Sequence, residues 1–131
     1  MNNLLITGAA GFIGRNVAAE ALRRGYSVTG VDRRAGEISG IEVVNADIRD
    51  TDLVRPLLKN KQYVIHLAAV TSNVEFIKKP QDCYDINVNG FLTVIDAAAR
   101  SGCQRFVYAS SAAVYSDAFS ETAAIDARMA R

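Results

Sequence analysis

The chain has 131 residues, which is the size of one ordinary domain and enough to bury a core without disulfides or metals. Half of the residues are hydrophobic and 22% are charged, a composition typical of a folded globular domain. The formal net charge is +1 and no long run of like charge occurs, so we expect no nucleic-acid partner.

The cysteines and the apolar stretches exclude several other classes of protein. Cys83 and Cys103 are the only cysteines, and neither has the spacing or the neighbouring histidines of a metal site. We therefore expect no metal and no disulfide, and interpret both as reduced thiols in a cytoplasmic protein. Glycines interrupt the apolar run near the N-terminus, and no stretch is long enough to span a bilayer, so we expect no membrane partner.

Short apolar runs alternate with helix-like segments along the chain. Because strands that alternate with helices pair in parallel, the order predicts an α/β fold, a Rossmann-like doubly wound sheet with the strand order 3-2-1-4-5. The sheet would form a single domain over residues 1–131, with a ligand across the carboxyl ends of its strands. The predicted strands are residues 4–6, 28–31, 41–44, 63–67 and 105–109.

Three helices are predicted between these strands. The first begins near Gly11 and ends at Gly25, and a short or bent helix containing Pro56 follows residue 50. The longest helix begins at Pro80 and ends at Gly102. Its expected apolar face consists of Tyr84, Val88, Phe91, Leu92, Ile95, Ala98 and Ala99. Residues 116–131 show neither a strand nor a convincing helix face.

A glycine-rich turn, residues 7–14, connects the first strand to the first helix. Unpaired N–H groups and the positive dipole end of a helix bind anions, so the turn suits a pyrophosphate. Gly8 would permit the tight turn, Gly11 a close approach of the phosphates, and Gly14 close packing of the helix on the sheet. Taken alone, the triplet is also compatible with a purely structural turn.

Asp32 stands at the end of the second predicted strand and favours a dinucleotide site over a purely structural turn. A carboxylate there can accept both hydroxyls of the adenosine ribose and would repel a 2′-phosphate, which predicts NAD. The alternative is a turn residue at the strand end. Arg33 and Arg34 follow directly, and a guanidinium there could stack on adenine or pair with a 2′-phosphate, so NADP is the alternative cofactor.

Five segments in order resemble motifs of one family. The spacing of the glycine turn is similar to that of the extended short-chain dehydrogenase/reductase family, the NAD-dependent sugar epimerases and dehydratases. The resemblance runs nearly end to end. Its other segments are residues 46–50 (ADIRD), 66–69 (HLAA), 86–90 (INVNG) and 108–115 (YASSAAVY).

The resemblance implies a role for particular residues. Asp47 and Ile48 would line the adenine pocket, and Leu67, Ala68 and Ala69 the ribose and nicotinamide side. The complete set of expected cofactor contacts is Gly8, Gly11, Phe12, Ile13, Gly14, Asp32, Arg33, Asp47, Ile48, Leu67, Ala68 and Ala69.

The resemblance also implies an active-site serine, Ser111, supported by Asn87. The alternative is that Ser110 is the functional serine. For Asn87, the alternative is a structural role in which its side chain bonds only to the backbone of its own helix. An isolated histidine at the end of an apolar strand is typical of a packed, hydrogen-bonded residue, so we interpret His66 in that way rather than as a base.

The same family uses a tyrosine and a lysine four residues later on a helix beyond the fifth strand. The last tyrosine here is Tyr115 and the last lysine is Lys79, so that pair does not occur in the sequence. The interpretation is the NAD-binding portion of a nucleotide-sugar epimerase or dehydratase, cut before the tyrosine. Whether it turns over substrate stays open.

The alternative is a noncatalytic NAD(P)-sensing or regulatory module. A nucleotide sugar is the expected substrate of the full enzyme. A homodimer is a further expectation, because the resemblance implies pairing through the helix at residues 80–101 and the last strand would be an exposed edge.

Overall fold

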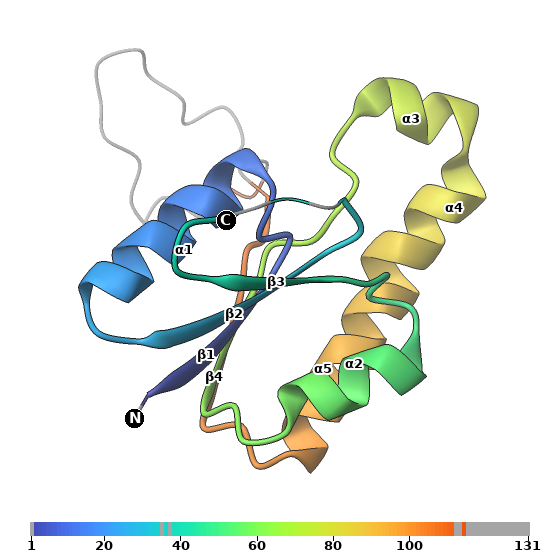
Figure 1. The fold of residues 1–131 in the computed structure, drawn as a ribbon. Coiled ribbons are helices and arrows are strands. Elements are labelled where there is room, and N and C mark those ends of the chain that lie inside the picture. Colours follow the sequence, from blue (N-terminus) through green and yellow to red (C-terminus); the bar gives the residue numbers. More distant parts are fainter. Residues whose placement is uncertain (1, 35, 37, 112–113, 115–131) are drawn as a thin grey trace.

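The computed structural model describes residues 2–34, 36, 38–111 and 114 and shows one parallel sheet with helices on both faces (Figure 1). The strand order is β3-β2-β1-β4-β5 and every neighbouring pair is parallel, which confirms the predicted doubly wound fold. The strands are β1 Asn3–Thr7, β2 Ser27–Asp32, β3 Glu42–Asn45, β4 Tyr63–His66 and β5 Arg105–Tyr108.

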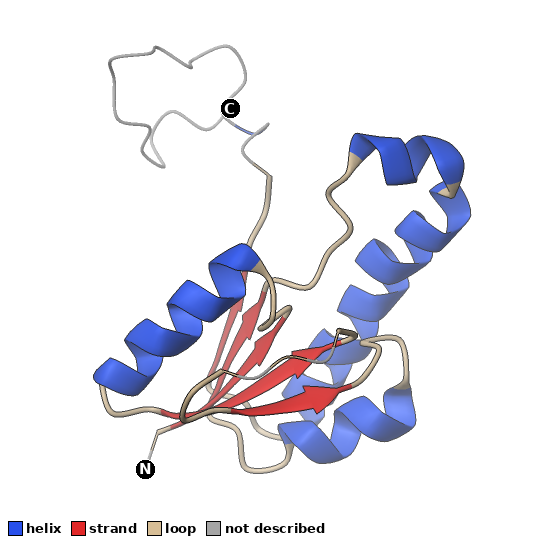
Figure 2. Cartoon of the chain, turned by 45° about the horizontal axis from the view of Figure 1, so that its top comes forward, coloured by secondary structure: helices blue, strands red, loops and turns tan. Residues whose placement is uncertain are grey.

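Helix α1 covers one face of the sheet, and α2 and α5 cover the other (Figure 2). Three further segments, two α-helices and one π-helical turn named η1, precede α5 along the chain. The bounds are α1 Phe12–Arg23, α2 Thr51–Leu58, α3 Asn73–Lys78, α4 Pro80–Tyr84, η1 Asp85–Gly90 and α5 Phe91–Arg100.

The alternation of side chains along β1 separates two apolar cores. Leu5 packs on the side of α2 and α5, whereas Leu4 and Ile6 pack on the side of α1. All three are almost completely buried, with at most 3% of their surface exposed. The central strand is therefore apolar throughout, as expected for a parallel sheet covered on both faces.

Helix α2 has eight residues, which confirms the short helix that was predicted around Pro56. Asp50 is its N-cap, and the carboxylate accepts hydrogen bonds from the backbone N–H groups of Asp52 and Leu53. Pro56 lies inside the helix. Helix α1 also ends as predicted, because Gly25 follows it with the left-handed φ of +81° that the chain reversal requires.

The longest helical segment differs from its prediction in two ways. It changes from α to π geometry at η1 and back again at α5, and its buried residues share only Ala98 with the predicted face. The predicted face includes Tyr84 and Leu92, but these side chains are 60% and 53% exposed. The face that packs on the core consists of Cys83, Ile86, Gly90, Val94, Ala97 and Ala98.

Cys83 and Cys103 are free thiols. Among the described residues there is no group of three or more histidine, cysteine or acidic side chains that could hold a metal. No helix in this part of the chain is long and apolar enough to cross a membrane.

Candidate functional site

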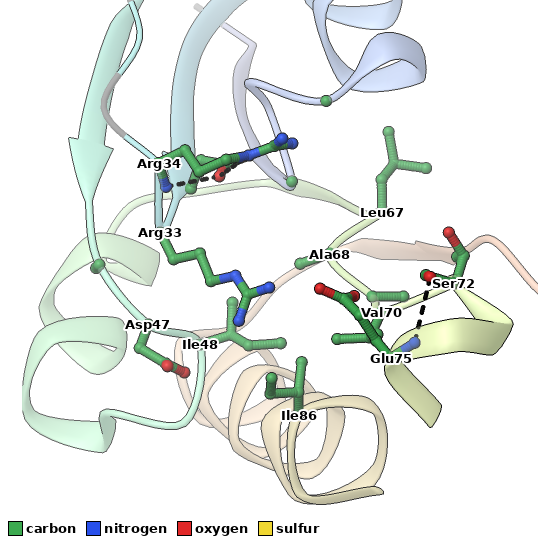
Figure 3. A pocket seen from close by; sticks show the side chains of 16 residues that line it. Arg33, Arg34, Asp47, Ile48, Leu67, Ala68, Val70, Ser72, Glu75 and Ile86 are labelled. Carbon is green, nitrogen blue, oxygen red and sulfur yellow. Dashed lines mark hydrogen bonds and ion pairs between the residues drawn. The ribbon is translucent and has the colours of Figure 1, made fainter. Parts of the chain in front are cut away.

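A cavity of about 420 Å³ lies at the carboxyl ends of β1, β2, β3 and β4 (Figure 3). The chain leaves β1 toward β2 on one side, and β4 lies on the other side of β1, so the cavity is at the topological switch point of the sheet. Its walls are Gly8, Gly11, Asp32, Arg33, Arg34, Ala46, Asp47, Ile48, Leu67, Ala68, Ala69, Val70, Thr71, Ser72, Glu75 and Ile86.

The glycine turn forms one wall of the cavity, and its backbone packs directly against the backbone at the ends of β2 and β4. Gly8 has a φ of +72°, and its N–H donates to the carbonyl of Val31 at 2.8 Å. A Cβ on Gly8 would lie 2.8 Å from the backbone nitrogen of Ala68, and one on Gly14 would lie 2.1 Å from the carbonyl oxygen of Gly8. A side chain at Gly14 would therefore collide with the backbone of the turn against which the start of α1 packs.

Helix α1 points its N-terminus at this turn. Gly11 is the N-cap with extended backbone, and among the described residues no side chain caps the first N–H groups. These N–H groups can therefore donate hydrogen bonds to a bound anion. Phe12 and Ile13 are 87% and 61% exposed and do not line the cavity, so what they can offer a ligand is their backbone N–H groups.

Asp32 is a buried carboxylate with two fixed backbone donors. Its Oδ2 accepts from the N–H of Ala10 and its Oδ1 from the N–H of Arg34, both at 2.9 Å. The side chain is only 7% exposed, and the Nε of Arg34 lies 3.8 Å from Oδ1. The two oxygens of a carboxylate offer about four acceptor positions, so each oxygen of Asp32 keeps about one for a ligand. Asp32 is both a turn residue and a carboxylate that faces the cavity.

Asp47 lies across the cavity from the glycine turn, after β3, and is bound in a fork by Arg49. Its Oδ1 accepts from the backbone N–H and from Nε of Arg49, and its Oδ2 accepts from Nη2. Hydrogen bonding to Arg49 lowers the pKa of the Asp47 carboxyl group below its usual value, so Asp47 is ionised at neutral pH.

The segment after β4 forms the wall that carries Leu67, Ala68 and Ala69, and a threonine holds it against β1. Thr7 Oγ1 accepts from the N–H groups of Leu67 and Ala68 at 3.3 and 3.2 Å. His66 Nδ1 lies 2.8 Å from the same hydroxyl oxygen. His66 is 2% exposed, which confirms that it is a packed, hydrogen-bonded histidine.

Asn87 and Ser111 lie outside the lining of the cavity. Asn87 brackets Val70, a lining residue, because Oδ1 accepts from its N–H at 2.8 Å and Nδ2 donates to its carbonyl at 2.9 Å. It thus bonds to the segment after β4 and not only to its own helix. Ser110 and Ser111 follow β5 and are exposed. Tyr115 and residues 116–131 lie outside the described residues.

Sequence reasoning missed one wall of the cavity. Thr71, Ser72 and Glu75 line it, but α3 was not predicted because it has only six residues. A signal was present in the sequence, since a serine followed three residues later by a glutamate is typical of a helix start. Ser72 is indeed the N-cap of α3, and its hydroxyl accepts from the N–H of Glu75.

Known proteins share this arrangement. The model of the NAD dependent epimerase/dehydratase family matches residues 4–128. The chain is 34% identical to a UDP-glucose 4-epimerase of Neisseria meningitidis, with 89% of this chain and 39% of the relative covered. It is 31% identical to the UDP-glucose 4-epimerase of Mus musculus, with 88% and 39% covered.

Solved structures give the same result. A UDP-glucose 4-epimerase of Stenotrophomonas maltophila with bound NAD and formylated UDP-arabinopyranose superposes with a TM-score of 0.79 at 31% identity, covering 88% of this chain and 38% of that one. MoeE5 in complex with UDP-glucose and NAD gives a TM-score of 0.78 at 34% identity, with 86% and 38% covered.

The chain thus spans about 39% of the length of the curated relatives it matches. The family model covers nearly all of the chain, and the two solved structures named above contain bound NAD. The chain belongs to the NAD dependent epimerase/dehydratase family.

Proposed function

We propose that this chain binds NAD in the cavity at the switch point and forms the cofactor-binding portion of a nucleotide-sugar epimerase or dehydratase. The observation that carries the proposal is Asp32, a buried carboxylate beside the glycine turn that keeps acceptor positions toward the cavity. A carboxylate in this position matches the two hydroxyls of an adenosine ribose.

The residues around the cavity fit the cofactor part by part. The pyrophosphate would lie on the N-terminus of α1, where a Cβ on Gly14 would collide with backbone. The adenine would lie between Arg33 and Ile48, beside Asp47, and the segment from Leu67 to Ala69 would face the second ribose and the nicotinamide. When bound, NAD supplies an acceptor for a hydride from the substrate.

The charge at Asp32 favours NAD over NADP. A 2′-phosphate would be placed against a buried carboxylate, and that repulsion outweighs pairing with Arg33 or with the largely exposed Arg34. The solved relatives described above carry NAD, which supports the same preference.

Calorimetric titration with NAD and with NADP tests the proposal. We expect saturable binding of NAD and roughly tenfold weaker binding of NADP, a difference of about 1.4 kcal/mol, because Asp32 would repel the 2′-phosphate. In Asp32→Asn the repulsion is removed while the shape is kept, so the ratio of the two affinities should fall toward one. Asp52→Asn changes an exposed carboxylate on α2 and should leave the ratio unchanged. A preference for NADP in the unmodified chain, or an unchanged ratio in Asp32→Asn, would contradict the assignment.

The substrate class and the roles of the polar side chains extend the proposal. Relatives with the same fold are named as UDP-glucose 4-epimerases or were solved with UDP-sugars, which supports a nucleotide sugar as substrate of the full enzyme. Ser111 would hydrogen-bond a substrate oxygen, and Asn87 would hold the segment at Val70 in place. We assign cofactor binding to these 131 residues, and turnover to a protein that also carries the tyrosine and lysine of the family.

A further inference from the structure

Strand β5 forms one edge of the sheet in the part of the chain that the structure describes. It pairs with β4 on one side, and none of the described residues pairs with its other side. The edge of a sheet presents a row of N–H and C=O groups that can bind a further strand. The sequence of β5 contains no proline, and its phenylalanine, valine and tyrosine favour strand structure. This edge is therefore able to accept a strand.

The backbone groups of β5 alternate between the two sides of the strand. The N–H groups of Arg105 and Ala109 donate at 3.3 Å to carbonyls in and next to β4. Because this alternation has a period of two residues, the backbone groups of Val107 also point toward β4. Those of Phe106 and Tyr108 point outward. The free edge thus offers a pair of residues whose N–H and C=O groups face a possible partner.

Two side chains of β5 are apolar and about half exposed. Val107 is 48% exposed and lies on the side of α1, where it lines an apolar groove together with Leu4 and Ile65. Tyr108 is 54% exposed and lies on the opposite face of the sheet, stacked on His66. A strand that added to this edge would cover part of both side chains.

We propose that the free edge of β5 binds β5 of a second copy of this chain in antiparallel orientation, with the two Val107 residues opposite each other on a twofold axis. Phe106 then lies opposite the partner's Tyr108, and the two residues exchange both of their outward hydrogen bonds. The twofold axis repeats this exchange, so both copies contribute the same residues. The inference does not depend on the proposed function, because no residue of β5 lines the cavity.

The side chains of β5 fit this register. Arg105 lies opposite the partner's Ala109, so the two guanidinium groups are not placed against each other. The two Val107 side chains form a contact between β-branched residues, and Phe106 lies beside the partner's Tyr108 on the other face. The strand is thus complementary to itself in charge, in side-chain type and in backbone hydrogen bonding.

Cysteine cross-linking tests the register. Opposite residues that do not exchange hydrogen bonds in an antiparallel pair have Cα atoms about 4.5 Å apart, which a disulfide can span. Cys103→Ser first removes the thiol nearest to β5. In that background, Val107→Cys should form a covalent dimer on mild oxidation. Arg105→Cys is the matched control on the same face of the strand, and should form roughly tenfold less, because its opposite residue is an alanine.

Sedimentation equilibrium of the full chain tests the interface without a cross-link. Val107→Lys places two like charges opposite each other, so the dissociation constant of the dimer should rise by at least about tenfold. Val107→Thr keeps a neutral β-branched side chain and should leave the dissociation constant close to that of the unmodified chain. Leu92→Lys is the control on the exposed face of α5, and should also have little effect.

Three outcomes would overturn the inference. One is a chain that stays monomeric at every concentration measured, which would mean that another segment or a different partner covers the edge. Another is equal cross-linking through Val107→Cys and Arg105→Cys. The third is a dimer that Leu92→Lys dissociates and Val107→Lys does not, which would place the interface on the helical segment. Titration of Val107→Lys with NAD should give the affinity of the unmodified chain, so a failure of the proposed cofactor site is distinguished from a failure of this interface.

Discussion

At the scale of single residues, His66 joins the ends of β1 and β4 beneath the cavity. Because Thr7 Oγ1 already accepts from backbone N–H groups, its proton is directed to Nδ1 of His66, which assigns the proton of the neutral ring to Nε2. The ring is enclosed by Phe91, Phe106 and Tyr108. Burial in this apolar setting lowers the pKa of His66 to about 4.

This burial predicts a loss of stability in mild acid. The unfolded chain takes up a proton on the histidine below its ordinary pKa of 6.5, whereas the folded chain does so only near 4. Stability is therefore complete above the first value and declines as the pH falls through the interval between the two. Urea unfolding should show a loss of about 2 kcal/mol between about pH 7.5 and pH 5.

The variant His66→Gln cannot titrate and isolates this effect from the carboxylates. It should be less stable than the unmodified chain at neutral pH, but should lose little further stability over the same interval. Because the chain has one histidine, proton NMR also gives its pKa without ambiguity. An NMR pKa close to 6.5 would contradict the account.

At the scale of elements, the π-helical turn η1 controls how the longest helical segment meets the cavity. Gly90 closes η1 and packs against Ile48, and a Cβ there would lie 2.6 Å from the Ile48 side chain. Asn87, in the middle of η1, holds both backbone groups of Val70. One short turn therefore supports two lining residues, in keeping with the frequent occurrence of π-turns at functional sites.

Removing the Asn87 side chain should loosen the segment after β4. Asn87→Ala leaves the N–H and carbonyl groups of Val70 without their partner, so we expect a loss of about 1–3 kcal/mol in the free energy of unfolding. Asn89→Ala is the control on the same turn, since that exposed side chain bonds only to Asp85 in the described contacts and should cost at most about 0.5 kcal/mol. Equal effects of the two substitutions in urea unfolding would show that the two hydrogen bonds between Asn87 and Val70 add no stability.

The same segment shows where prediction from the sequence stopped. Apolar residues occur on two faces of the helix after Pro80, and both faces have helical spacing. Periodicity alone could not tell that Val94 packs inward while Leu92, two residues before it, is 53% exposed. The π-turn has no sequence signal of its own, because it depends on contacts such as that of Gly90 with Ile48.

At the scale of the whole molecule, the parallel sheet collects short loops that are distant in the sequence at one edge. Gly8 follows β1, Asp32 ends β2, Asp47 follows β3 and Ala68 follows β4, and all four line one cavity. This convergence was predictable, because right-handed crossovers place the carboxyl ends of parallel strands together. The partners that fix these residues were not predictable, since the contacts of Arg49 with Asp82 and Asp85 join segments more than thirty positions apart.

Amide-resolved NMR titration of the chain with NAD tests the central claim most directly. The account predicts saturable shifts at the carboxyl edge of the sheet, in residues 8–14, at Asp32, at residues 47–48 and in residues 67–72. Gly25 and Gly102, which lie in the turns that lead into β2 and β5 at the opposite edge, should not shift. Shifts that never saturate, or that are confined to the opposite edge, would contradict the account.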